Sequence, residues 1–233
     1  MRIEMIAGVV FLSGLFLSGR EASAVVVPFV EDFSAGTSGW LNTSNAALTH
    51  FSSGGPTGGS YVSTAVPFTA APPGRGAMVI FRGEEDNFAS GGALLDNWIA
   101  DGAGLLTAYI RHQAPESLTT FARFATQFNF PGATIEDPTL VPPNVWTQVR
   151  FEVSPANPRL TLEGPISFAS VFGDVGNVQI GVAVPAAQES NAAPFVYDLA
   201  LVSVQVPEPT TLAAALGIAA VLWMVGVRRC AGR

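Results

Sequence analysis

The sequence predicts an all-β domain, an antiparallel β-sandwich or jelly roll, that covers residues 25–206. Three observations lead to this fold class. Several short segments alternate apolar and polar residues with the period of two that a strand requires. Clusters of Gly, Pro, Ser and Thr separate these segments, as turns between strands do. The region is also about 180 residues long, which is enough for one domain with a sizeable core.

Seven segments along the chain are expected to be strands. They are residues 76–83, 105–113, 119–130, 145–153, 159–164, 177–184 and 195–206. The alternation is clearest in 145–153, where Val149 and Phe151 share one face and Gln148 and Arg150 share the other. Segment 119–130 is ambiguous, because its phenylalanines also fit helical spacing; we expect a strand there because its neighbours are strands.

The N-terminus has the organisation of a secretory signal peptide, residues 1–24. Arg2 precedes an apolar stretch from Ile6 to Leu17. The small residues Ala22 and Ala24 then flank Ser23, which fits signal cleavage after Ala24. A retained anchor helix is less favoured, because the apolar stretch is short. We therefore expect export through the inner membrane.

The C-terminus contains a candidate transmembrane helix, residues 210–227, without a charged residue. A helix of this length measures roughly 27 Å, close to the thickness of a bilayer core. Arg228 and Arg229 follow at once in the tail 228–233 and would stop transfer, leaving the C-terminus in the cytoplasm. The alternative is a buried core helix, although such a helix is rarely apolar on every face.

Residues 207–233 carry a three-part pattern. Pro207, Glu208 and Pro209 are followed by the apolar span and then by the arginine cluster. This order resembles the PEP-CTERM sorting signal of exported bacterial proteins. The resemblance implies recognition by an exosortase, processing near Pro207–Pro209, and release of a transiently anchored domain to the cell surface or beyond. It also implies an association with exopolysaccharide and biofilm matrix.

The region 25–206 is acidic and poor in charge. It has no lysine, and its six arginines face fifteen acidic residues, a formal charge of −9. Such a surface repels nucleic acid and other polyanions. Neutral polysaccharide, a cation or another protein remain as partners.

Spaced glycine and aromatic residues give the region a second resemblance. Trp40, the Gly-rich turn before Tyr61, Trp98 ahead of Gly102 and Gly104, and Trp146 are spaced as in laminin-B-type and related carbohydrate-binding jelly rolls. The resemblance supports the fold more than the function. The aromatic rings themselves are candidate sugar-stacking platforms, because a pyranose stacks on the flat apolar face of an exposed ring. We expect Trp98, Tyr61 and Tyr109 to be such ligand-binding residues, and Trp40 and Trp146 to lie in the core.

Jelly rolls of the resembled type often hold a structural Ca²⁺ where the first and last strands meet. Here the resemblance would join Glu31 or Asp32 to Asp198, all of which offer the oxygen ligands that Ca²⁺ prefers. The alternative is that Glu31 and Asp32 sit at a strand edge and Asp198 faces solvent.

The sequence gives little sign of an active site. His50 and His112 are its two histidines, no serine lies in G-x-S-x-G, and its one cysteine, Cys230, is in the tail. We therefore expect a non-catalytic surface or matrix protein, or alternatively a carbohydrate-binding module. A glycoside hydrolase is a weaker alternative, in which two of several glutamates would meet in space. Those glutamates are Glu84, Glu85, Glu116, Glu152 and Glu163.

Overall fold

The computed structural model describes residues 24–72, 74 and 76–207. Two predicted segments lie outside these residues. One is the signal peptide up to residue 23, with Ala22 of the cleavage motif. The other is the sorting signal from Glu208 and Pro209 onward, with the transmembrane segment, Arg228 and Arg229. Among the described residues, no helix has the length and apolarity needed to cross a membrane.

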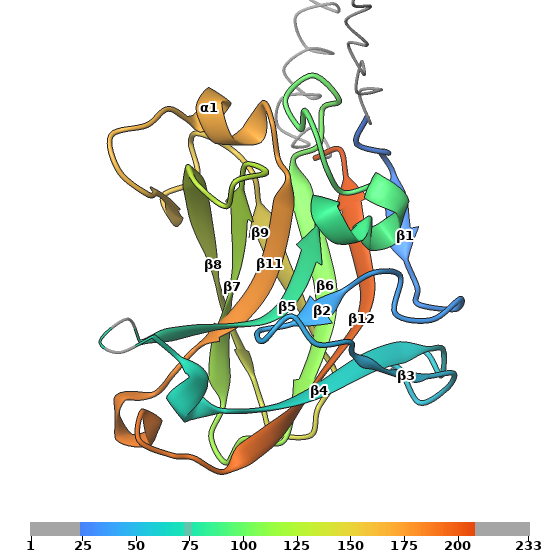
Figure 1. Ribbon diagram of the computed structural model, residues 1–233, viewed down its shortest axis with the longest axis vertical. Helices are drawn as coiled ribbons and strands as arrows, with labels where there is room; N and C mark the ends of the chain where they lie inside the picture. Colours follow the sequence, from blue (N-terminus) through green and yellow to red (C-terminus); the bar gives the residue numbers. More distant parts are fainter. Residues whose placement is uncertain (1–23, 73, 75, 208–233) are drawn as a thin grey trace, which may run out of the picture.

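The structure confirms the predicted sandwich of two antiparallel sheets (Figure 1). Sheet A has the order β3-β4-β12-β6-β9, with β1 paired to β12, and sheet B has the order β10-β8-β7-β11-β5-β2. The strands of sheet A are β1 (Phe29–Glu31), β3 (Thr49–Phe51), β4 (Tyr61–Pro67), β6 (Leu105–His112), β9 (Thr147–Glu152) and β12 (Pro194–Gln205). The strands of sheet B are β2 (Leu41–Asn42), β5 (Ala77–Glu84), β7 (Leu118–Ala125), β8 (Gly132–Val141), β10 (Leu160–Leu162) and β11 (Asn177–Ala183).

Short helical segments connect some of the strands. They are α1 (Phe168–Phe172) and the 3₁₀ turns η1 (Phe68–Ala70), η2 (Glu85–Asn87), η3 (Ala89–Gly92) and η4 (Ala186–Gln188). Ser167 caps α1 by accepting a hydrogen bond from the Ser170 backbone N–H, which satisfies one of the donors that a helix start leaves free.

Strand alternation decides which side chains fill the space between the sheets. In β11, Val178, Ile180 and Val182 are buried in the core, as predicted. The intervening Gln179 and Gly181 therefore lie on the outer face of sheet B. The ambiguous segment is a strand only as far as Ala125, and residues 126–131 form a turn before β8.

One buried histidine is held inside the sandwich. His112 is fully buried at the end of β6, and its Nε2–H donates to the Val141 carbonyl, 2.8 Å away. Burial lowers the pKa of His112, because desolvation disfavours the charged imidazolium. Within the described residues, its Nδ1 and the Tyr197 hydroxyl have no hydrogen-bond partner, and burial raises the pKa of Tyr197.

Candidate functional site

A polar groove runs over the outer face of sheet B, with a cavity volume of about 580 Å³, a size typical of small-ligand sites. Its lining comes from β5, β7, β8, β11 and the adjoining loops; the residues used below are Arg82, Arg123, Asn129, Glu136, Glu163 and Gln179. The Phe121 ring also lines the groove and lies over Gly181 of β11. A Cβ on Gly181 would collide with this ring and with the Met78 carbonyl.

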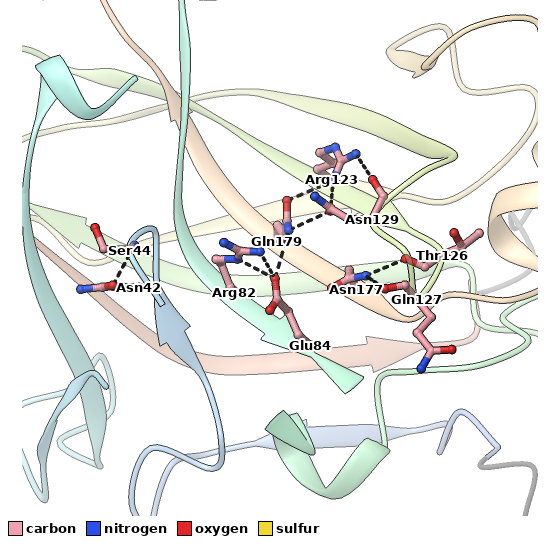
Figure 2. A network of polar contacts seen from close by, with 10 residues as sticks. All are labelled: Asn42, Ser44, Arg82, Glu84, Arg123, Thr126, Gln127, Asn129, Asn177 and Gln179. Atoms are coloured by element: carbon pink, nitrogen blue, oxygen red, sulfur yellow. Dashed lines mark hydrogen bonds and ion pairs between the residues drawn. The ribbon is translucent and has the colours of Figure 1, made fainter. Parts of the chain in front are cut away.

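Gln179 lies at the centre of the network that forms the groove floor (Figure 2). Its side-chain amide donates to the Glu84 carboxylate at 3.4 Å and to Asn129 Oδ1 at 3.3 Å, and its Oε1 accepts from Arg123 at 3.2 Å. Arg82 forms an ion pair with the same Glu84 carboxylate. All three Gln179 bonds are long for hydrogen bonds of this type, so a ligand hydroxyl can replace one of them at low cost.

Arg123 fixes one end of the groove. Its guanidinium makes a bidentate ion pair with Glu163, at 2.6 and 2.7 Å, and also donates to the side chain and the carbonyl of Asn129, at 2.6 and 2.8 Å. Bidentate charge-assisted bonds of this kind are strong and directional. They hold the turn 126–131 against the sheet, and Asn177 adds a 2.6 Å bond to the Thr126 carbonyl.

The groove has no excess of positive charge, because its lining also holds the Glu136 carboxylate. Arg82 is paired with Glu84 and Arg123 with Glu163, so neither guanidinium is available to select an anion. Thr120 pairs with the core residue Val182, so its side chain points into the sandwich, and its buried hydroxyl, which has no hydrogen-bond partner among the described residues, does not face the groove. A groove with several hydrogen-bonding groups and no net positive charge is suited to an uncharged, hydroxyl-rich ligand.

The sequence-predicted Tyr61 and Tyr109 lie elsewhere, on the outer face of sheet A. The strand register places Phe51 opposite Tyr61 and Tyr109 opposite both Ala200 and Gln148. Extending the register of β4 and β12 by one residue places Tyr61 beside Ala200. The structure therefore brings two of the three predicted ligand residues into one row across one face.

Trp146 folds over this face from the start of β9. Its Nε1–H donates to the Gly54 carbonyl at 3.1 Å, and its ring meets Tyr61 edge-on at 5.5 Å between centroids. The Arg111 guanidinium lies 4.6 Å from the Trp146 ring centroid and 5.2 Å from that of Tyr61. Trp146 is thus half-buried on the outer face, contrary to the core position that we expected.

The expected exposure of Trp98 is wrong. Its side chain is fully buried, its Nε1–H donates to the Leu94 carbonyl at 2.9 Å, and its ring packs edge-on against Phe124. The loop around it folds back over the core, which no local pattern in the sequence indicates. Trp98 therefore has no free face for a sugar, whereas Trp40 is buried as predicted.

The three carboxylates of the predicted calcium site do not converge. The first and last strands do pair, but Glu31 lies opposite Val202, four residues from Asp198. The Glu31 carboxylate accepts the Phe33 N–H, and that of Asp32 accepts the Ser34 N–H. Hydrogen bonds from the side chain and then the backbone of Ser34 lower the pKa of Asp32. Asp198 is buried against Arg111 rather than facing solvent.

A site made of these three residues therefore does not fit calcium. Across residues 24–72, 74 and 76–207, no group of three or more His, Cys, Asp or Glu residues is placed to hold a metal ion. Calcium binding remains a prediction without a located site.

Sequence reasoning missed the groove residues Arg82, Arg123, Asn129 and Gln179. They come from distant strands and one turn, so their meeting is a consequence of sheet order. One signal was present: the alternation in 177–184 already assigned Gln179 and Gly181 to the face away from the core. The glutamates proposed for a hydrolase are also separated, and of these only Glu84 and Glu163 take part in the groove's ion pairs described above.

No protein-family model matches the chain, and no curated protein sequence matches it. Solved structures with a similar arrangement include an exo-beta-agarase, at 10% identity and a TM-score of 0.49, covering 76% of this chain and 24% of the other. They also include a Clostridium thermocellum endo-1,4-beta-D-xylanase, at 11% identity and a TM-score of 0.45, covering 77% and 28%. A family 30 carbohydrate binding module has 12% identity and a TM-score of 0.41, covering 81% and 87%.

These likenesses are distant. The chain spans about a quarter of the length of the agarase and xylanase chains. Carbohydrate-binding and glycoside-hydrolase proteins are among the chains with a similar sandwich, and the likeness concerns the fold alone.

Proposed function

We propose that this chain is an exported, non-catalytic protein whose β-sandwich binds neutral polysaccharide in the groove of sheet B. The observation that carries the proposal is the charge-balanced set of hydrogen-bonding groups around Gln179. Planar amide and guanidinium groups match the paired hydroxyls of a sugar ring. The exposed Asn129 side chain, which accepts from Arg123 and Gln179, adds one more amide that a ligand can contact.

The groove favours binding over hydrolysis. Glu84 and Glu163 are each held by an arginine and act as anchors for Arg82 and Arg123. A glycosidase instead needs two carboxyl groups directed at one scissile bond, one of them protonated. We therefore propose that these glutamates position binding groups.

Delivery to the matrix rests on the two terminal segments. We propose that residues 1–24 direct export, that residues 210–227 anchor the chain transiently, and that an exosortase-type enzyme processes it near Pro207–Pro209. Pro207 lies against Gly104, directly after β12 ends at Gln205, so little linker separates the domain from the sorting motif. The released domain would then bind exopolysaccharide outside the cell.

Calorimetric titration of the purified protein against a panel of neutral polysaccharides tests the groove. Gln179→Ala and Asn129→Ala are expected to weaken binding at least about tenfold, since each removes hydrogen-bonding groups from the groove. Gln188→Ala, which changes a half-buried glutamine elsewhere, is the matched control. The Arg123–Glu163 pair and the bond from Arg123 to the carbonyl of residue 129 remain in Asn129→Ala, so its melting temperature should fall little.

The proposal fails if both groove variants melt like the wild type and bind every bound polysaccharide equally well. Release of reducing ends from the same polysaccharides would show a hydrolase instead. Delivery is tested separately, by mass spectrometry of the mature protein from its native host. Unaltered ends, or unchanged surface delivery after deletion of residues 207–233, would refute the sorting route.

A further inference from the structure

We infer that the outer face of sheet A is a second glycan-binding surface, so that one domain holds two polysaccharide segments on opposite sides. This inference rests on the proposed function, because it takes the same class of ligand. The aromatic face is defined by Phe51, Tyr61, Tyr109 and Trp146. In a sandwich the outer faces of the two sheets point in opposite directions (Figure 1), so one short glycan segment cannot reach both.

The aromatic face is a row of side chains across sheet A. Phe51 and Tyr61 stack with centroids 4.7 Å apart and planes 6° apart. Ala200 then separates Tyr61 from Tyr109 in the same row. Two strand spacings, or about 10 Å, lie between the two tyrosines, and Ala200 is fully buried beneath the side chains around it.

The rings are held in place before any ligand arrives. Trp146 is fixed by its bond to the Gly54 carbonyl, and Arg111 lies against both Trp146 and Tyr61. Arg111 in turn donates to Asp198 at 2.8 Å. Pre-ordered aromatic side chains lose little conformational entropy on binding.

The chemistry of this face selects an uncharged ring. The Arg111 charge is balanced by Asp198, which leaves flat apolar surface as the main feature. Phe51 remains 41% exposed and Tyr61, Tyr109 and Trp146 are half-buried. Phe51 and Arg111 cover the two faces of Tyr61, so the exposed parts of Phe51, Tyr109 and Trp146 are the surface that suits the apolar side of a pyranose. The hydroxyl edge of the sugar can reach polar neighbours such as Gln148.

Two surfaces on one domain have a consequence that a single groove lacks. A protein that binds two chains, or two distant segments of one chain, gains avidity and cross-links long polysaccharide. The same protein then acts as a connector of extracellular matrix.

Trp146 supplies a built-in probe of the second surface. Trp40 and Trp98 are fully buried, and among the described residues Trp146 is the one tryptophan that solvent reaches. Replacing Trp223, in the C-terminal segment, by Phe leaves a full-length chain whose ligand response reports Trp146. We expect a neutral oligosaccharide that binds the groove to change this emission also in Gln179→Ala.

Variants of the aromatic face complete the test. Phe51→Ala and Tyr109→Ala are expected to weaken the Trp146 response about tenfold, while groove affinity measured by calorimetry is retained. Leu140→Ala, which removes another exposed apolar side chain, should change neither. Light scattering should show long polysaccharide cross-linked by the wild type, and by neither Gln179→Ala nor Tyr109→Ala.

The outcomes separate the two proposals. Groove binding without any Trp146 response, or cross-linking that survives Tyr109→Ala, overturns the second surface and leaves the proposed function intact. A Trp146 response in a protein whose binding is unchanged by Gln179→Ala and Asn129→Ala overturns the groove and leaves the aromatic face. One binding site per chain at saturation, with Trp146 responding, also overturns the two-sided arrangement.

Discussion

Removing Arg111 should destabilise the domain more than a surface ion pair would. The side chain of Asp198 is 4% exposed and that of Arg111 is 27% exposed, and their atoms are 2.8 Å apart. Arg111→Ala leaves the Asp198 carboxylate buried without its cation. Breaking a fully buried pair costs about 3–5 kcal/mol. Because Arg111 is partly solvated, we expect about 2–3 kcal/mol here.

The lost contacts with Trp146 and Tyr61 add to this cost. Cation–π contacts at partly exposed sites contribute about 0.5–1 kcal/mol, which brings the expected total for Arg111→Ala to about 3 kcal/mol. For a domain of this size, that corresponds to a fall in melting temperature of about 6–12 °C. Urea denaturation followed by circular dichroism measures the change as a lower midpoint at constant slope.

A double-mutant cycle distinguishes the ion pair from lost packing. Arg111→Met with Asp198→Leu removes both charges together, and the pair of changes should cost far less than the sum of the single changes. If Arg111→Ala and Asp198→Leu each cost less than about 0.5 kcal/mol, the size of an ordinary surface change, the reasoning about a desolvated carboxylate is refuted. Additive costs would refute the coupling.

Three further outcomes follow from the same structure. Stability should fall as the pH drops below about 6.5, the unfolded-state pKa of a histidine. The pKa of buried His112 is lowered in the folded protein, so the unfolded chain binds the proton first. Thermal melts of His112→Gln from pH 8 to 4 should lack this component, and a profile identical to that of the wild type would contradict it. Gly83→Ala would place a Cβ 2.9 Å from the Trp40 ring and should lower the free energy of unfolding by about 1–3 kcal/mol. Gly59→Ala, whose nearest contact is at 3.8 Å, should melt like the wild type. Equal melting of the two variants would argue against tight packing around Trp40. Excess chelator should leave the melting temperature unchanged, because the three predicted calcium ligands are separately engaged; a drop of several degrees would reveal a calcium site elsewhere.

The sequence by itself determined the fold class and most of the strands. Alternation in 145–153 and 177–184 requires one buried and one outer face, since any shift by one residue would bury polar groups. The buried Val149, Phe151, Val178 and Ile180 follow from that pattern. The acidic, lysine-free composition likewise disfavours nucleic acid without any structure.

Only the tertiary structure decided which outer residues meet. Arg82, Arg123 and Gln179 come from β5, β7 and β11, and they become neighbours because β11 pairs between the other two strands. The same holds for Trp98, whose burial depends on how its loop closes over the core. Contacts between distant residues set this closure, and it leaves no periodic trace in the chain. Trp146 differs, because the alternation in 145–153 places it on the same face as Gln148 and Arg150, and the expected core position disagreed with that pattern.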